Sequence, residues 1–362
     1  MKLVSLFALL CGAAPAATLY LGAYPDSILV FDEAKGQIVD RIHLETGLPR
    51  NLRLSLDKKL LYVYTIDHNG IEIIDLATRK VINHFTLDTP ARRYRFDEGG
   101  VLDPENKLLY TVTTEIDKKI DHYEIGQPKY TVIDVPGQKI SKTVDIPRDE
   151  QNGGRGYGGR GAGFEISPDG KYLYQFRDKI EILDSSDFKV VDSIDLAKPE
   201  VPGQEMENIG FGAELASIAE PGRRISLFNS SDPIVHNRVF GIARFDLTTR
   251  QVDYTPIGPA VPGMTGLQVT PDRKKAYTVV STGQHGNKRC EFWAFDLTND
   301  RVTQTAEFAC RARFSFGISG DGKKLYIYAA GFQIEVYDAA TLKYERTWDL
   351  NNDLTGPMVV VN

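Results

Sequence analysis

The sequence predicts an all-β chain that folds as a seven-bladed β-propeller of four-stranded blades. Two observations carry this prediction. Apolar and aromatic residues alternate through most of the 362 residues, while long amphipathic helical stretches are missing. A short phrase, an apolar residue followed by Asp and a polar turn, also recurs seven times. A repeat of this length is typical of units of about four strands that are arranged in a ring.

The recurring aspartates mark the turn between the third and fourth strands of each unit. A carboxylate in this position can accept hydrogen bonds from backbone N–H groups about two residues further on, which fixes the turn. A second phrase, seen as ISPDGK from Ile166 to Lys171, marks the turn between the first two strands. We therefore expect a structural role for the seven aspartates, which are Asp32, Asp75, Asp134, Asp184, Asp246, Asp296 and Asp338.

The propeller is expected to occupy residues 18–362. Its units are expected at 18–46, 48–90, 91–148, 160–197, 207–257, 262–309 and 310–350. The fifth unit lacks a clean inner turn phrase, for which LASIAEPGRR is the best candidate. The first unit has only three strands, and the C-terminal run GPMVVVN belongs to no unit. We expect this run to complete the first blade, because closing the ring removes two exposed sheet edges.

Residues 1–17 are predicted to be a signal peptide. They contain one Lys, an apolar run from Leu3 to Leu10, and the small-residue pattern Ala14-Pro15-Ala16. Cleavage near Ala16 or Ala17 would give a periplasmic or secreted chain with no further segment for membrane insertion. Only Cys290 and Cys310 would then remain, so a disulfide is expected. The hairpin of the sixth unit predicts that the two cysteines lie directly opposite each other.

The turn phrases resemble those of a known family. IIDLATRK and ISPDGKYLY are similar to the repeats of YVTN propellers and of the non-catalytic propeller (β or heavy) subunit of quinoprotein amine dehydrogenases. The likeness covers residues 18–362. Those dehydrogenases keep their quinone on another subunit, so the resemblance implies no catalytic residue here. It implies a scaffold that holds a partner, such as a structural subunit of a redox enzyme.

Long, irregular connections are expected on one face of the ring, which is where binding usually occurs. The most unusual is GGRGYGGRGAG, from Gly153 to Gly163. It matches the glycine pattern of dinucleotide loops, but a strand and not a helix is predicted after it, so the match is coincidental. This loop can carry Arg155, Tyr157 and Arg160 to the channel mouth, or it can be a disordered surface loop whose arginines are solvated. We expect Arg92, Arg93 and His285 to join them and to bind an anion.

Three functional interpretations stay open. The first is a non-catalytic propeller that binds a small anionic ligand or a partner protein. The second is a lactonase-type hydrolase, for which His285, Glu207 and Arg155 would have to converge. The third is a scaffold without a pocket. A net charge of −6 argues against nucleic acid as the partner. The histidines show no metal-ligand spacing, so neither a metal nor a cofactor is expected.

Overall fold

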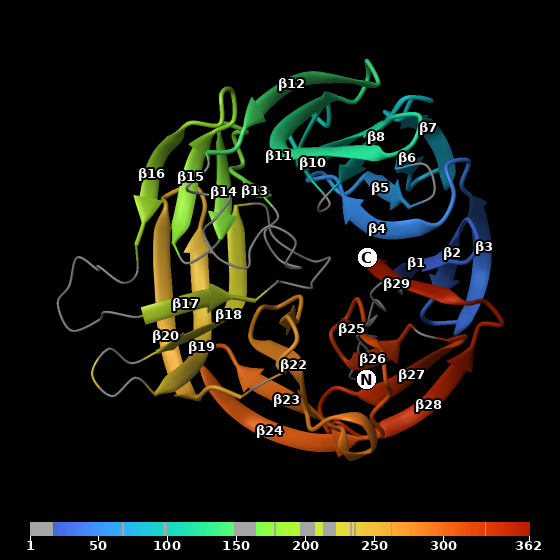
Figure 1. Ribbon diagram of the computed structural model, residues 1–362. Helices are drawn as coiled ribbons and strands as arrows, with labels where there is room; N and C mark the ends of the chain where they lie inside the picture. The colour runs from blue at the N-terminus through green and yellow to red at the C-terminus, as the bar shows by residue number, and fades with distance from the viewer. Residues whose placement is uncertain are drawn as a thin grey trace, which may run out of the picture.

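In the computed structural model, the described residues are 17–66, 69–96, 100–147, 164–176, 179–195, 207–212, 222–231, 234, 237–261, 263–329 and 331–362. Their strands form seven antiparallel sheets around a ring (Figure 1). Blade 1 contains β1 (Thr18–Ala23), β2 (Ser27–Asp32), β3 (Gln37–His43) and β29 (Leu354–Val361). Blade 2 contains β4 (Pro49–Leu54), β5 (Leu60–Thr65), β6 (Gly70–Asp75) and β7 (Lys80–Thr86). Blade 3 contains β8 (Arg92–Phe96), β9 (Val101–Leu102), β10 (Leu108–Lys118), β11 (Tyr123–Asp134) and β12 (Lys139–Asp145).

The remaining blades follow in chain order. Blade 4 contains β13 (Phe164–Ile166), β14 (Tyr172–Phe176), β15 (Ile180–Asp184) and β16 (Val190–Ile194). Blade 5 contains β17 (Glu207–Phe211), β18 (Arg223–Ser231), β19 (Arg238–Asp246) and β20 (Gln251–Pro259). Blade 6 contains β21 (Gln268–Val269), β22 (Lys275–Thr282), the short 3-10 helix η1 (His285–Asn287), β23 (Arg289–Asp296) and β24 (Arg301–Phe308). Blade 7 contains β25 (Ser315–Ile318), β26 (Lys324–Tyr328), β27 (Gln333–Asp338) and β28 (Tyr344–Asp349).

The strand order confirms the predicted fold class. Strands follow one another within each sheet, except that β29 joins β1 and makes blade 1 the sheet β29-β1-β2-β3. The C-terminal strand therefore closes the ring, as expected. In blade 3 the innermost position is shared by β8 and β9, which both pair with β10.

The hydrophobic core lies between neighbouring blades. One apolar cluster joins Leu21 and Leu29 of blade 1 to Ile334 of blade 7, and similar clusters fill the other contacts around the ring. The second and third strands of a blade are covered on both faces, so they read as continuous apolar runs such as LLYVYT. The outermost strands, such as β7, alternate between exposed and less exposed residues.

The seven turn aspartates have the structural role that the sequence predicts. Each accepts a backbone N–H two or three residues further on, at distances of 2.7 to 3.0 Å. These turns, together with those between the innermost and second strands, make up one face of the ring, called here the turn face. The opposite face, called the loop face, carries the connections between second and third strands and those from one blade to the next.

Candidate binding face

Blade 3 carries a long hairpin on the loop face. The strands β10 and β11 have 11 and 12 residues, whereas the equivalent strands β5 and β6 have six each. Their ladder continues to the pair Lys118 and Tyr123. The sequence suggested an irregular insertion here. The structure shows that both strands continue through it, with one irregularity in their register between Thr114 and Ile116.

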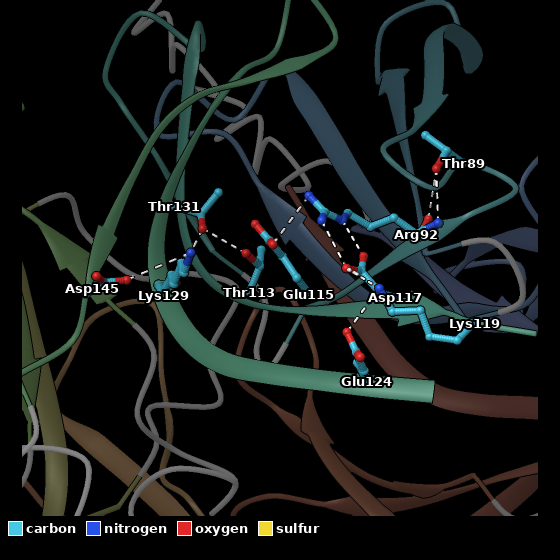
Figure 2. Close-up of polar contacts among 10 residues, drawn as sticks. All are labelled: Thr89, Arg92, Thr113, Glu115, Asp117, Lys119, Glu124, Lys129, Thr131 and Asp145. Atoms are coloured by element: carbon cyan, nitrogen blue, oxygen red, sulfur yellow. Dashed lines mark hydrogen bonds and ion pairs between the residues drawn. The ribbon is translucent and has the colours of Figure 1, made fainter. Parts of the chain in front are cut away.

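Arg92 of β8 ties down the outer part of this hairpin, close to the end of its ladder (Figure 2). Its Nε donates to Asp117 Oδ1 at 2.6 Å and its Nη2 donates to Oδ2 at 3.1 Å, while Nη1 lies 3.4 Å from Glu115 Oε2. The hydrogen bonds from Arg92 lower the pKa of the Asp117 carboxyl, and those bonds in turn raise the pKa of Arg92. Lys119 extends the network to Glu124, with Nζ and Oε2 3.0 Å apart. A two-pronged Arg–carboxylate contact of this kind restricts geometry more than a single ion pair does.

Large apolar side chains gather on the same face. Twelve are exposed among the described residues. Five lie on outermost strands, where each sheet borders solvent: Val39, Ile82, Val190, Val191 and Tyr344. The other seven lie in the hairpin extension or in connections between second and third strands, and none of the twelve lies in a turn of the turn face. The seven are Tyr24, Ile66, Ile120, Tyr123, Ile125, Ile234 and Phe332.

Two of the residues predicted to bind an anion can be compared directly. Arg92 is engaged by Asp117 and Glu115, so its charge is already neutralised. Its neighbour Arg93 is exposed and makes no ion pair with any residue that the structure describes. Of the two arginines, Arg93 is therefore the one whose charge is available to bind an anion.

Of the other predicted members, the structure describes only the backbone of His285. His285 begins η1 in blade 6, which stands across the ring from blade 3 (Figure 1). Arg155, Tyr157 and Arg160 lie outside the described residues, as does the whole stretch 148–163. Within the described residues, no group of three or more His, Cys, Asp or Glu side chains could hold a metal ion.

The predicted disulfide between Cys290 and Cys310 is confirmed, with a Cα–Cα distance of 5.2 Å. The predicted register was wrong. Cys290 pairs with Phe308, and Cys310 follows two residues beyond that position, outside β24. The bridge therefore ties the connection from blade 6 to blade 7 back onto β23. Arg311 in this connection donates from Nε to Glu335 Oε1 at 3.0 Å, so the loop is held at two adjacent points.

Two glutamates of the third strands, the buried Glu72 and the partly buried Glu335, were missed by sequence reasoning. Glu72 is completely buried, and its Oε1 accepts from the backbone N and the hydroxyl of Thr46 at 2.6 and 2.7 Å. Thr46 lies in the connection from blade 1 to blade 2. In the same way, Glu335 of blade 7 accepts a hydrogen bond from Arg311, which lies in the connection from blade 6 to blade 7. The signal was a Glu three residues before the turn Asp, as in GIEIID and QIEVYD. These glutamates hold the loop face in place.

No known protein family and no curated protein matches this sequence. Among solved structures, the fold is similar to a protein of unknown function from Desulfotomaculum acetoxidans DSM 771, with a TM-score of 0.55, 12% identity, and coverage of 96% of this chain and 99% of that one. It is similar to the dihydro-heme d1 dehydrogenase NirN in complex with DHE, with a TM-score of 0.53, 15% identity, and coverage of 96% and 75%.

A third similar structure is a Bacteroides fragilis NCTC 9343 protein provisionally described as a 6-phosphogluconolactonase. Its TM-score is 0.51 at 15% identity, and the match covers 97% of this chain and 99% of that one. The structural similarity establishes the propeller fold, but at identities this low it says nothing about a ligand. Among the described residues, no helix has the length and apolar character that crossing a membrane requires.

Proposed function

We propose that this chain is an exported, non-catalytic propeller that docks a partner protein on its loop face. The observation that supports this most directly is the distribution of exposed apolar side chains. Connections of blades 1, 2, 3, 5 and 7 each present at least one of them on the same face. Scattered apolar residues are normal on a protein surface, but a set that converges on one face is typical of an interaction site.

The hairpin of blade 3 is the main contact in this proposal. Ile120 is fully exposed at its tip, and Tyr123 is 60% exposed beside it. Aromatic and branched side chains on a rigid element lose little conformational entropy on binding, so they often contribute most of the affinity. The Arg92–Asp117 contact supplies this rigidity close to the tip of the hairpin.

The partner in this proposal is a protein with an apolar patch, and the sequence resemblance suggests a subunit of a redox enzyme. The hydrolase alternative has less support. It requires His285, Glu207 and Arg155 to converge, and the side chains of these three residues lie outside what the structure describes. A small anion at Arg93 is compatible with partner docking, because an acidic group of the partner could occupy the same position.

Site-specific photo-cross-linking tests this proposal. A photoreactive amino acid is placed at Ile120, Ile66 or Phe332 on the loop face, and at Val190 or Tyr344 on outermost strands as matched exposed controls. Cross-linking is carried out in cells that express the protein at its natural level. We expect the three loop-face positions to capture one common protein that the two control positions do not capture. Identical cross-linking from both sets, or none from the loop face, would contradict partner docking.

A further inference from the structure

Glu33 lies on the turn face where blade 1 adjoins blade 7, close to both ends of the described chain. The backbone N of Glu33 donates to the carbonyl of Ala17 at 3.2 Å. The Glu33 carboxylate reaches across to blade 7, where Oε1 accepts from the hydroxyl of Tyr326 at 3.0 Å and from the backbone N of Gly320 at 3.3 Å. Glu33 is thus a bridge between the first and last blades.

Gly320 is the point on which the chain ends converge. The side-chain amide of Asn362 donates to its carbonyl at 3.0 Å. A Cβ placed on Gly320 would lie only 2.2 Å from the Cβ of Ala17, so Ala17 packs directly against it. Ala17 is only 4% exposed. Ala17 and the Glu33 carboxylate therefore both contact Gly320, and Ala17 precedes Thr18 where Glu33 follows Asp32 in the ladder that pairs Thr18 with Asp32.

This carboxylate has no cation among the described residues. The charged groups that act on it are Asp32 and Asp321, both acids. Arg346 acts on the neighbouring Tyr326 and forms an ion pair with Glu345 at 3.7 Å. The lysines of the same two turns are taken, since Lys35 pairs with Asp32 at 3.0 Å and Lys323 pairs with Asp321 at 3.3 Å. Burial is the main reason that the pKa of Glu33 rises from 4.5 to about 7, although Tyr326 and Gly320 donate to it. A positive charge at this point would offset the cost of burial.

The sequence offers one such charge. Ala14-Pro15-Ala16 is the pattern that a signal peptidase recognises, and Ala17 follows it immediately. We propose that cleavage between Ala16 and Ala17 places the new α-ammonium group of Ala17 beside the Glu33 carboxylate, and that this ion pair latches blade 1 to blade 7. In the cleavage, water adds across the Ala16–Ala17 amide, so Ala16 leaves with a carboxylate and Ala17 gains the ammonium group. Removal of the leader then completes the closure of the ring.

The latch changes how stability depends on pH. Without the ammonium group, the folded pKa of Glu33 lies above its ordinary value, so the folded chain binds this proton more tightly than the unfolded chain does. Stability then falls as the pH rises from about 4.5 to about 7. With the ammonium group present, the carboxylate is stabilised in its charged form and this loss is reduced. The site lies on the turn face, so this proposal is independent of the partner that the loop face binds.

The test compares two forms of a chain that begins at Ala17 and is made in an oxidising cytoplasm, one with a free α-amine at Ala17 and one acetylated there by a co-expressed N-terminal acetyltransferase. At pH 7 we expect the acetylated form to melt about 2 to 4 °C lower. The difference should disappear in Glu33→Gln. It should persist in Glu45→Gln, which makes the same chemical change at an exposed position. The intact mass of the exported protein should show Ala17 as its first residue.

Three results would overturn the latch. The first is an exported chain that begins at a residue other than Ala17. The second is equal melting of the free and acetylated forms at pH 7. The third is a difference that survives Glu33→Gln, since that outcome would place the effect of the amine somewhere else.

Discussion

Thr18 of β1 lies directly opposite Val361 of β29, so the two ends of the chain share one antiparallel ladder. The pairing runs from Thr18 to Ala23 with one irregularity after Leu21. Each blade packs on two neighbours, and this ladder is what makes blade 1 a complete partner for both blade 2 and blade 7. The stability of the whole ring therefore depends on the last strand of the chain.

Deletion of residues 354–362 should remove the cooperative folding of the entire ring. It exposes an edge of β1 and opens the apolar cluster that Val360 shares with blade 7. We expect the thermal transition to broaden or vanish in circular dichroism. Deletion of Asn362 alone is the matched control, because it leaves β29 complete, and it should retain a sharp transition. Normal melting of the longer deletion would show that β29 does not close the ring.

Loss of the disulfide should destabilise the chain by about 3 kcal/mol, because the cysteines are 20 residues apart and the bridge restricts the unfolded chain. The double variant Cys290→Ser, Cys310→Ser tests this by urea denaturation. The wild-type protein, purified without reductant, should show no free thiol from this pair. Two reactive thiols in that sample would contradict the bridge.

Glu72→Ala should destabilise blade 2 by about 2 to 4 kcal/mol, since it leaves the backbone N and the hydroxyl of Thr46 without their acceptor in a buried site. Glu72→Gln keeps an acceptor oxygen and should cost less. Glu45→Ala removes an exposed carboxylate near the same connection and serves as the control. If all three variants unfold at the same urea concentration as the parent, Glu72 does not hold the connection.

Asp296 should titrate well below an ordinary aspartate. Hydrogen bonds from the side chains of Thr298 and Asn299, and from the backbone of Thr298, lower its pKa from 3.8 to about 2. Because the folded pKa lies below the unfolded one, this contribution to stability is complete above about pH 4 and is lost as the pH falls toward 2. Carboxyl-detected NMR titration measures the pKa directly, and Asp296→Asn should remove this part of the acid dependence. A pKa near 3.8 would contradict the turn geometry.

The repeat was predictable because its chemistry is local. Each of these turns needs one carboxylate acceptor at a fixed position, so a single Asp marks it in the sequence. The seven aspartates could therefore be found without a structure. The closing strand was predictable for a different reason, since GPMVVVN was an apolar strand without a blade. In both cases the sequence contained a constraint that only one arrangement satisfies.

The position of Cys310 was not predictable, because the register between β23 and β24 depends on two features that the residues of these strands do not indicate. The turn after β23 comprises the four residues between Asp296 and Arg301, which sets the ladder earlier than the cysteines suggest. A bulge between Ala294 and Phe295 then shifts it by one residue. The same bulge recurs just before the turn aspartate in blades 1, 2, 3, 4 and 7. Repetition could have revealed it, but no single turn phrase does.

The position of the loop face was predictable, but the contacts that its residues make were not. The sequence predicted that Arg92 and Arg93 both bind an anion. The structure shows that Arg92 already pairs with Glu115 and Asp117, which lie 23 and 25 positions further along the chain. Long-range pairing of this kind depends on how far a hairpin extends. The apolar tips, such as Ile120 and Phe332, were hidden among many similar residues that are buried.

The pair Arg92 and Arg93 offers a sharp test of anion binding at the loop face. Arg92→Gln breaks contacts that exist within the chain, whereas Arg93→Gln removes a cation that no described residue neutralises. Thermal shift is measured for both variants and the parent against organic acids and sugar phosphates. If an anion stabilises the parent, Arg93→Gln should lose most of that shift and Arg92→Gln should keep it, because binding to the folded state raises stability according to affinity. Without ligand, Arg92→Gln should also lower the free energy of unfolding by less than about 1 kcal/mol, as is usual for exposed ion pairs. A parent that responds to no anion, or a shift that depends on Arg92 and not on Arg93, would contradict an anion site at Arg93 and leave the apolar tips as the basis for binding.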